Sequence, residues 1–564
     1  MRKATGLSLL LALLLLTTAL AAAIRLPRLA ERPMHTDEAV HAVKFATLID
    51  EGQYVYDPCD YHGPTLNYFT LVAGWICGAQ LDDLEDELEK AGTIKYYFTL
   101  VAGWIRGERT YEEIDERTLR LVPVAFGVLL VLLVAGIGDG LGWPGALAAA
   151  LLTAISHAMV FYSRYYIQEI LLVFFTFCLI ISGWRYYRSR RLIWAILAGV
   201  SAAFMHATKE TFVIALGAMV MAVAATVLMG GRGAIAGVAR VRKINVLHLC
   251  IAALAALVVS SVLFSCYLQN PRAIIDSVAT YKTYFDRAGH NSVHIHPWYY
   301  YLRIIGFYRV QGGPMWTEAF ILLLAGAGLV AALLNRGLGS ADRAFVRFIA
   351  FYAVILTVVY SLIPYKTPWC MLGFLHAWLL LAGAGAAALL RTASGRLARA
   401  MVMVLLVLGA GHLSWQAVRG TYRYYDHANP YVYGHTVRDI FSVVKTIEEM
   451  AELHPHGRNM YIEVICPGAD YWPLPWYLRR YPNVGYYTDV DTSVGPAPVI
   501  VGYASLEKQI FNKIFAAPPG QYSTYVPLFE DYVELRPTVE LTGMVMWDLK
   551  DGRLKAHAGA GDIK

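Results

Sequence analysis

The chain has 564 residues, of which 57% are hydrophobic and only 16% are charged, and its mean hydropathy is +0.46. This composition is far too apolar for an ordinary soluble globular protein, so the sequence predicts a membrane protein. The net charge of +6 does not point to nucleic acid, because the basic residues are dispersed between apolar runs and form no continuous basic stripe.

Eleven hydrophobic runs approach the roughly 20 residues that a helix needs to cross a bilayer. They lie near residues 5–24, 118–138, 143–162, 167–184, 192–207, 211–229, 246–267, 317–334, 348–363, 369–390 and 400–418. The first run follows Arg2 and Lys3 and ends in small residues, as a cleavable signal peptide does. Its apolar length of about 20 residues favours a retained anchor. The sequence therefore predicts a polytopic α-helical protein with about 11 transmembrane helices.

Lysine and arginine collect in alternate connections between these runs. They occur at the N-terminus and in residues 184–191, 230–245, 335–347 and 391–399. The positive-inside rule places these segments, and with them the N-terminus, in the cytoplasm. Outside then lie a first large loop, a second large loop and the C-terminal part, at residues 25–117, 268–316 and 419–564. We expect a transmembrane domain at residues 1–418 and a C-terminal extracytoplasmic domain at 419–564.

The sequence after residue 419 is mixed rather than apolar. Residues 436–454 predict a helix with one apolar face, formed by Val437, Ile440, Phe441, Val444, Ile447 and Ala451. "NMYIEVI" and "APVIVGYA" predict buried strands, so this part is expected to form a small α/β domain. No glycine-rich phosphate loop or nucleotide fingerprint occurs in the chain.

The polar residues with useful chemistry all fall on the predicted outer face, several of them at helix ends. They occur in "MHTDEAVHA" at 34–42, "YDPCDYHGP" at 56–64, "SRYYIQE" at 163–169, "HATKE" at 206–210 and "PYKTPW" at 364–369. An ionisable group near the end of a membrane helix is expensive to desolvate and is a functional candidate by default. These segments predict a single outward-facing site at the membrane surface.

Carboxylates beside basic residues at that level suit a lipid-phosphate substrate. Arg164, Lys209 and Lys366 are candidates to neutralise the phosphate, and Asp37 or Glu38 to deprotonate an incoming hydroxyl. Transfer of a sugar from a polyprenyl phosphate has this charge pattern.

Each of these candidates also has a purely structural interpretation. Thr36 can act as the N-cap of a helix whose first turn holds the acids, and Arg164 can extend toward lipid headgroups. Lys209 can be a polar break between two spans, and Lys366 can lie in a rigid turn between two prolines.

Four motifs, in this order, resemble the prokaryotic family described as flippase-activity-associated: "MHTDEAVHA", "YHGPTLNYFT", "IPYKTPW" and "NPYVYGHT". With the long first outer loop and the C-terminal domain, the chain is similar over roughly its whole length to GT-C membrane glycosyltransferases of the protein O-mannosyltransferase and aminoarabinose-transferase branch. The resemblance implies a GT-C-like fold and an inverting reaction. It implies Asp37 as the base that acts on the acceptor, with Glu38 beside it. Glu169 matches the acidic residue of a later outer loop, and Arg164 and Lys366 match donor-phosphate contacts.

Metal use is left open by the resemblance, since some GT-C enzymes use a divalent metal and others do not. The candidate ligands in this chain are Asp37, His41 and His62.

A tandem duplication interrupts the first outer loop. "YFTLVAGWI" occurs at 68–76 and again at 97–105, with a period of 29 residues. Each copy is too short to span a bilayer, so a helix lying on the membrane surface is the expected form. The second copy departs from the single element expected in the family.

The sequence thus predicts a membrane glycosyltransferase, specifically an inverting hexosyltransferase of the cell envelope, in the cytoplasmic membrane. The expected partners are a polyprenyl-phosphate sugar as donor, membrane lipid, and a glycan, lipid or protein acceptor. The catalytic set is Asp37, Glu38 and Glu169, and the phosphate-binding set is Arg164, Lys209 and Lys366. The predicted acceptor groove contains His41, Tyr61, His62, Tyr365 and Trp369. Two alternatives remain open, an accessory protein of a lipid-linked glycan flippase and a non-catalytic glycan-binding membrane protein.

Overall fold

The computed structural model describes residues 2–59, 62–78, 110–230, 245–288, 294–310, 312–516 and 524–552. The chain divides into two compact units. The membrane unit comprises Met1–Leu29, Thr47–Arg109 and Arg117–Tyr433, and the sheet unit comprises Ala30–Ala46, Thr110–Glu116 and Gly434–Lys564. The predicted domain boundary after residue 418 falls in the last turn of the helix that ends at Tyr422.

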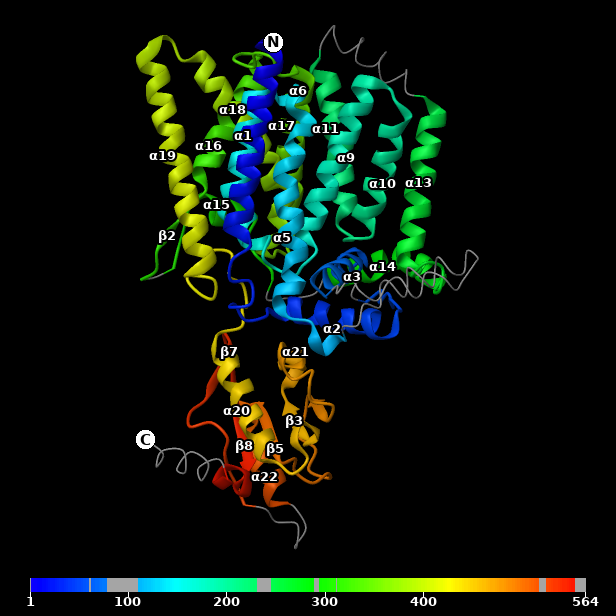
Figure 1. The fold of residues 1–564 in the computed structure, drawn as a ribbon, viewed down its shortest axis with the longest axis vertical. Helices are drawn as coiled ribbons and strands as arrows, with labels where there is room; N and C mark the ends of the chain where they lie inside the picture. Colours follow the sequence, from blue (N-terminus) through cyan, green and yellow to red (C-terminus); the bar gives the residue numbers. More distant parts are fainter. Residues whose placement is uncertain are drawn as a thin grey trace. The chain divides into compact units, whose positions relative to one another are not determined.

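The membrane unit is built from helices, most of which run side by side (Figure 1). Its α-helices are α1 (Arg2–Arg25), α3 (Thr65–Gly78), α5 (Glu116–Leu133), α6 (Gly138–Leu141), α7 (Trp143–Ile155), α8 (His157–Tyr162), α9 (Glu169–Ser189), α10 (Leu192–His206), α11 (Phe212–Met229), α13 (Val246–Phe264), α14 (Arg272–Ala288), α15 (Tyr300–Gly306), α16 (Ala319–Leu334), α17 (Arg343–Leu362), α18 (Leu372–Thr392) and α19 (Gly395–Tyr422). A short hairpin pairs β1 (Tyr308–Arg309) with β2 (Met315–Trp316). Helix α2 (Thr36–Glu51) begins in residues of the sheet unit and ends in residues of the membrane unit.

Eight helical segments of the described residues are long and apolar enough to cross a membrane. They are Ser8–Arg25, Glu116–Leu141, Glu169–Ser189, Phe212–Met229, Val246–Phe264, Arg343–Leu362, Pro368–Thr392 and Gly395–Tyr422. Three shorter apolar helices, α7, α10 and α16, lie where the other three spans were expected. The protein is therefore an integral membrane protein with a polytopic helical fold, as predicted, but the count of eleven spans is not confirmed.

One expected span, residues 143–162, is divided into two helices. Helix α7 ends at Ile155, and Ser156 then caps α8 by accepting a hydrogen bond from the Met159 N–H. The hydrophobic run continues across the break, so hydropathy alone does not reveal it. A serine that offers its side chain to a new helix start is the physical reason for the division.

Helix α18 is the most deeply packed of the candidate spans, and its glycines allow the close packing. A Cβ atom added to Gly385 lies 1.9 Å from the Leu324 carbonyl oxygen of α16. A Cβ atom added to Gly383 lies 2.3 Å from the Gly145 carbonyl oxygen of α7. Small residues let helix backbones approach where lipid gives no hydrophobic driving force between helices. The helices α7, α16 and α18 therefore form a tight central group.

The sheet unit holds a six-stranded sheet in the order β4-β3-β5-β8-β6, with β7 also paired to β8. The strands are β3 (Ile462–Ile465), β4 (Val484–Tyr487), β5 (Val499–Tyr503), β6 (Tyr525–Pro527), β7 (Val533–Arg536) and β8 (Val539–Met546). The helices of this unit are α20 (Asp439–Leu453), α21 (Leu474–Tyr477) and α22 (Glu507–Phe515). The two predicted strands correspond to β3 and β5, which are parallel neighbours. The predicted C-terminal α/β sheet is therefore confirmed.

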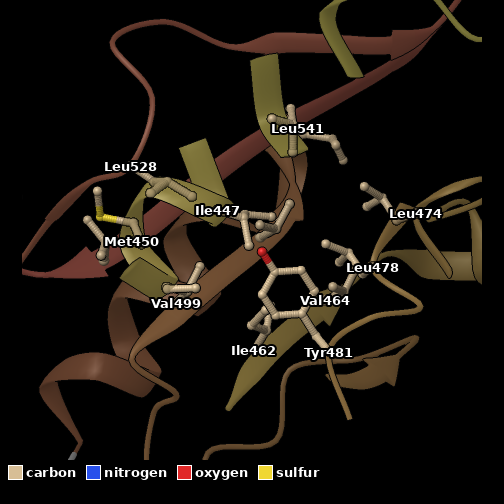
Figure 2. Packing of buried hydrophobic residues seen from close by; sticks show 14 of the residues in the cluster. Ile447, Met450, Ile462, Val464, Leu474, Leu478, Tyr481, Val499, Leu528 and Leu541 are labelled. Atoms are coloured by element: carbon tan, nitrogen blue, oxygen red, sulfur yellow. The ribbon is translucent and has the colours of Figure 1, made fainter. Parts of the chain in front are cut away.

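Helix α20 provides one wall of the core of this unit. Its Ile447 and Met450 pack with Val464 of β3 and Leu541 of β8 (Figure 2). Of the predicted apolar face, Ile440, Ile447 and Ala451 are buried, but Phe441 is 37% exposed and Val437 precedes the helix. The buried Val443 and Met450 were not predicted.

Helix α3 carries the first copy of the duplicated sequence and lies at one end of the helix bundle rather than among the long helices (Figure 1). The second copy, at 97–105, lies outside the described residues.

Candidate functional site

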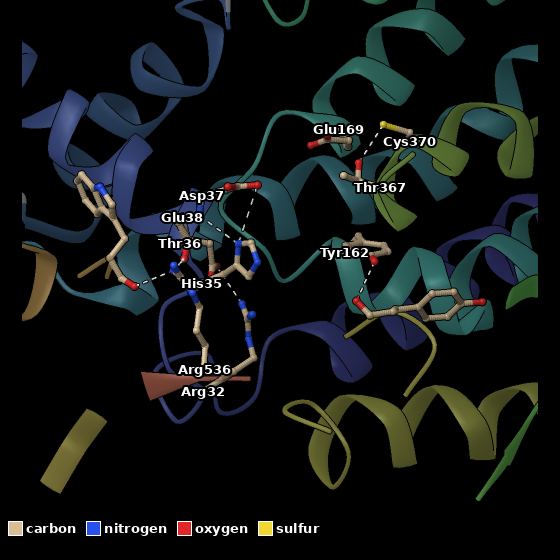
Figure 3. A network of polar contacts seen from close by, with 12 residues as sticks. Arg32, His35, Thr36, Asp37, Glu38, Tyr162, Glu169, Thr367, Cys370 and Arg536 are labelled. Carbon is tan, nitrogen blue, oxygen red and sulfur yellow. Dashed lines mark hydrogen bonds and ion pairs between the residues drawn. The ribbon is translucent and has the colours of Figure 1, made fainter. Parts of the chain in front are cut away.

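The N-terminus of α2, in residues of the sheet unit, presents the acidic motif of the first loop (Figure 3). The His35 ring accepts a hydrogen bond at Nδ1 from the Asp37 N–H, at 3.1 Å. The His35 N–H donates in turn to Glu38 Oε2, at 2.9 Å. This reciprocal pattern is that of a capping box, with the imidazole in the place of a serine or threonine hydroxyl. His35 therefore caps α2, one residue before the Thr36 expected in that role.

The two neighbouring acids of this motif have different environments. Glu38 is fully buried, and its second carboxylate oxygen pairs with Arg32 Nη2 at 2.8 Å. Both oxygens of Glu38 are thus engaged in holding the helix start, which assigns it a positioning role. The Asp37 side chain is 43% exposed. It lies in the first turn of α2, at the positive end of the helix dipole.

Residues of the sheet unit also anchor the first turn of α2. Arg536 donates to Thr36 Oγ1 at 2.8 Å and forms an ion pair with Asp470. The Met34 N–H donates to the Tyr477 hydroxyl at 2.8 Å. These contacts fix the backbone on both sides of His35.

A second polar centre lies within the membrane unit, where α9 begins. Lys209 Nζ lies 2.5 Å from Glu169 Oε1, and both side chains are less than 10% exposed. Burial by itself lowers the pKa of Lys209, but the nearby Glu169 carboxylate reverses this effect, and the pKa lies well above its usual value. Lys209 therefore carries a buried positive charge at neutral pH.

A narrow cavity of about 30 Å³ adjoins this ion pair. Its lining combines the pair with Tyr352, Trp369 and Cys370 and with the apolar side chains of α9, α17 and α18. The Tyr352 side chain is buried, and its hydroxyl has no hydrogen-bond partner in the described part of the chain. Cys370 Sγ lies 3.2 Å from Thr367 Oγ1 (Figure 3). The cavity has the volume of about one water molecule, so a larger ligand requires side chains to move apart.

Two of the predicted segments pair with each other in the membrane unit. His62 and Lys209 form an isolated antiparallel bridge, and the Thr65 N–H donates to the Ala207 carbonyl oxygen at 3.0 Å. A Cβ atom added to Gly63 lies 2.1 Å from that same oxygen, so glycine is required for the approach. The structure thus brings "HGPT" at 62–65 against "HATKE", while Tyr61 lies outside the described residues.

Arg164 and Lys366, both predicted to bind the donor phosphate, donate mainly to backbone carbonyls. Arg164 bonds the carbonyl oxygens that follow the end of α1, at Arg25, Pro27 and Arg28. Lys366 Nζ donates to the carbonyl oxygens of Ile363, Pro364 and His296. Both side chains therefore hold chain segments in place, and of the three predicted phosphate-binding residues only Lys209 lines the cavity beside Glu169.

A second cavity in the membrane unit, of about 300 Å³, is rich in aromatic residues. Its lining includes His296, Tyr300, Arg303, Tyr308 and Tyr433. Volumes of this size are typical of small-ligand pockets. Tyrosine rings and an arginine suit a saccharide that carries negative charge.

The remaining predicted groove residues are distributed between the two units. Tyr365 is 46% exposed, and its ring lies 4.9 Å from that of His294. Trp369 is buried, and its ring lies 6.0 Å from that of Tyr433. His41 is buried on α2 in the sheet unit. Among the described residues, no group of three or more His, Cys, Asp or Glu side chains is arranged to hold a metal ion. The candidates Asp37, His41 and His62 therefore do not form such a group.

Sequence reasoning missed Glu318, which joins three segments of the membrane unit. Its carboxylate accepts hydrogen bonds from Ser156 Oγ, the N–H groups of His157 and Ala158, and the Tyr431 hydroxyl. It thereby supports the N-terminus of α8 from 160 residues away along the chain. No local pattern indicates this role; only a lone glutamate at the start of an apolar run hints at it.

Comparison with known proteins agrees with this architecture. Residues 15–269 match the model of the family "Dolichyl-phosphate-mannose-protein mannosyltransferase". No curated protein matches the sequence of the chain.

Two solved structures have similar folds. The first is ArnT from Cupriavidus metallidurans in the apo state, with a TM-score of 0.59 and 13% identity over 96% of this chain and 98% of that chain. The second is the same protein bound to undecaprenyl phosphate, with a TM-score of 0.57 and 13% identity over 94% of this chain and 97% of that chain. Part of this chain, residues 15–269, thus matches the protein mannosyltransferase family model, and the chain as a whole has the predicted GT-C fold, as seen in ArnT.

Proposed function

We propose that this protein is a membrane glycosyltransferase that moves a sugar from a polyprenyl-phosphate donor to an acceptor on the outer face of the cytoplasmic membrane. The observation that carries the proposal is the contrast between two adjacent acids. Glu38 is buried and fully engaged, whereas the neighbouring Asp37 is half-exposed on a helix start that His35 and Glu38 hold in place. A rigidly held, solvent-accessible carboxylate suits a general base.

The proposed reaction is a single displacement. Asp37 removes the proton from an acceptor hydroxyl as the acceptor oxygen bonds to the anomeric carbon. The bond between that carbon and the phosphate oxygen breaks, and polyprenyl phosphate leaves with the bonding electrons. Lys209, a buried cation, stabilises the charge that develops on the leaving phosphate. Attack opposite the leaving group inverts the anomeric configuration, which makes the enzyme an inverting hexosyltransferase.

Two further observations support a lipid-linked sugar as donor. ArnT, which has the same fold, has been solved bound to undecaprenyl phosphate. Lys209 lines a cavity whose other walls are largely apolar side chains of membrane helices, and this combination suits a phosphate attached to a hydrocarbon chain. The aromatic cavity beside His296 and Tyr433 is our candidate for the acceptor, a glycan, lipid or protein.

Sugar transfer in membranes tests this function. Membranes that contain wild type or Asp37→Asn at equal expression are supplied with a panel of radiolabelled polyprenyl-phosphate sugars, with and without a chelator. We expect one donor to be used by wild type and transfer by Asp37→Asn to fall about 10²- to 10⁴-fold with donor binding retained. The chelator arm reports whether a divalent metal is required.

Undiminished transfer by Asp37→Asn contradicts the assigned base. No transfer from any donor, with translocation of a lipid-linked glycan still dependent on the protein, supports a flippase accessory instead. If neither transfer nor translocation depends on the protein, a non-catalytic glycan-binding role follows.

A further inference from the structure

A large open cavity lies at the opposite end of α9 from Glu169. Helix α9 has 21 residues, so its two ends are about 30 Å apart, roughly the thickness of the hydrocarbon core. The cavity measures about 630 Å³ and is separate from the cavity beside Lys209. Its lining consists of Ala135, Gly136, Asp139, Ile181, Arg185, Arg188, Ser189, Arg191 and Trp194.

The charged side chains of this cavity give it an excess of positive charge. Three arginines and one aspartate line it. Asp139 lies 3.5 Å from Arg185 and 3.8 Å from Arg188, and it also accepts a hydrogen bond from Trp184 Nε1 at 3.1 Å. One carboxylate neutralises at most one of the three guanidinium groups. The two remaining positive charges suit an anion with several acceptor oxygens.

The backbone that forms the cavity is held firmly. Helix α9 ends at Ser189, the next residue, Arg190, caps it with a left-handed φ of 56°, and α10 starts at Leu192. On the facing side, Gly136 lies in a short 3-10 helix, Val134–Ile137. A Cβ atom added to Gly136 lies 2.8 Å from Ile181 Cγ2, so this short helix touches α9. The arginines therefore project from a tight helical hairpin rather than from a long loop.

Apolar side chains next to the arginines indicate that the anion belongs to a lipid. Ile193 is 51% exposed in the first turn of α10, between the lining residues Arg191 and Trp194. A free phosphate fills only a small part of 630 Å³, and it makes no favourable contact with an exposed apolar side chain such as Ile193. A phospholipid fits both features, with its phosphate at the arginines and an acyl chain along the exposed apolar side of α10.

We propose that this cavity binds the headgroup of an anionic phospholipid at the membrane face opposite to Glu169 and Lys209. The site does not depend on the proposed transferase reaction. The arginines bind the lipid phosphate, Trp194 lies at the level of the headgroups, and Asp139 limits the affinity by competing for Arg185 and Arg188.

Lipid binding by purified full-length protein tests the site. Native mass spectrometry of detergent-solubilised protein measures retention of phosphatidylglycerol, phosphatidylcholine and inorganic phosphate. The test variants are Arg188→Gln, the double variant Arg188→Gln/Arg191→Gln, and Asp139→Asn. Arg396→Gln is the matched control, because it removes an exposed arginine of α19 that does not line the cavity.

We expect phosphatidylglycerol to bind wild type and Arg396→Gln alike, with affinity falling about fivefold for each arginine removed from the cavity. Asp139→Asn is expected to bind more tightly, because the amide still accepts from Trp184 but no longer neutralises an arginine. Opposite signs at Arg188 and Asp139 separate a charge effect from misfolding, which weakens binding in both variants.

Equal phosphatidylglycerol binding by wild type and the double variant overturns the proposal. So does equal retention of phosphatidylcholine, or displacement of the lipid by millimolar inorganic phosphate, which identifies a site for the free ion.

Discussion

The Glu169–Lys209 ion pair permits a test that separates stability from function. Lys209→Met removes the ammonium and leaves the Glu169 carboxylate 7% exposed beside a small cavity. Glu169→Gln/Lys209→Met removes both charges and leaves two neutral side chains of similar size. We expect the single variant to be much less stable than the double variant, and neither to transfer sugar.

The magnitude follows from the distance and the burial. Two unit charges 2.5 Å apart attract each other by roughly 6 to 7 kcal/mol at an effective dielectric constant of about 20. Desolvation of each ion costs several kcal/mol, so the net contribution of the intact pair is close to zero. Removal of one partner costs about 3 to 5 kcal/mol, because the other charge remains buried. This corresponds to a fall in Tm of about 3 to 4 °C for the single variant, because the unfolding entropy of a chain of 564 residues is large.

Thermal unfolding of detergent-solubilised protein, together with a donor-binding assay, measures both effects. Lys513→Met is the matched control, because Lys513 and Glu463 form a pair of equal length, 2.5 Å, buried in the sheet unit. Both single variants are expected to lose stability, but only the variants at Lys209 are expected to lose donor affinity.

Two results refute the reasoning. If Glu169→Gln/Lys209→Met is as unstable as Lys209→Met, the two residues are not energetically coupled. If the double variant is stable and transfers sugar at the wild-type rate, the pair contributes packing alone and Lys209 does not act on the leaving phosphate.

Three further predictions concern neighbouring groups. The stability that Lys209 contributes is fully present below its ordinary pKa of 10.5 and is lost only as pH rises through the higher pKa of the folded state. The Tm difference between wild type and Lys209→Met should therefore stay constant from about pH 7 to pH 10. A decline within that range shows that Lys209 titrates there. Glu38→Gln keeps the bond from the His35 N–H but loses the charge facing Arg32, and should lower stability by about 1.5 to 3 kcal/mol in chemical denaturation; an unchanged midpoint contradicts the positioning role. Arg164→Gln should lower the Tm without raising the donor KM of the folded protein, because Arg164 bonds backbone carbonyl oxygens. A raised KM at unchanged Tm would show instead that Arg164 binds the donor phosphate.

Hydropathy located the helical segments because burial in lipid demands long apolar runs and helices satisfy their own backbone groups. It did not reveal the break at Ser156, because the apolar run continues across it. Glu318, which also supports the new helix start, lies in a distant part of the chain. It also gave no indication that three of the runs form helices of only 13 to 16 residues.

For the candidate site, the sequence identified segments better than it identified individual roles. The pairing of Lys209 with Glu169 and the bridge between His62 and Lys209 bring together residues from three predicted segments. The sequence predicted Thr36 as the N-cap of α2, one residue after the actual cap, His35. Serine, threonine, aspartate and asparagine are the usual N-cap residues, so histidine was not expected. The commitment of Arg164 to carbonyl oxygens depends on the irregular chain after α1, which no periodic pattern describes.

The close glycine contacts of α18 have a consequence for motion. A helix whose Gly383 and Gly385 touch neighbouring backbones cannot slide or rotate without collision, so α7, α16 and α18 move as one rigid block. In contrast, α19 and α13 are the least buried of the eight long spans in the described part of the chain. Any opening that admits a long-chain lipid to the interior of the membrane unit must therefore be made by displacement of the peripheral helices around a stationary centre.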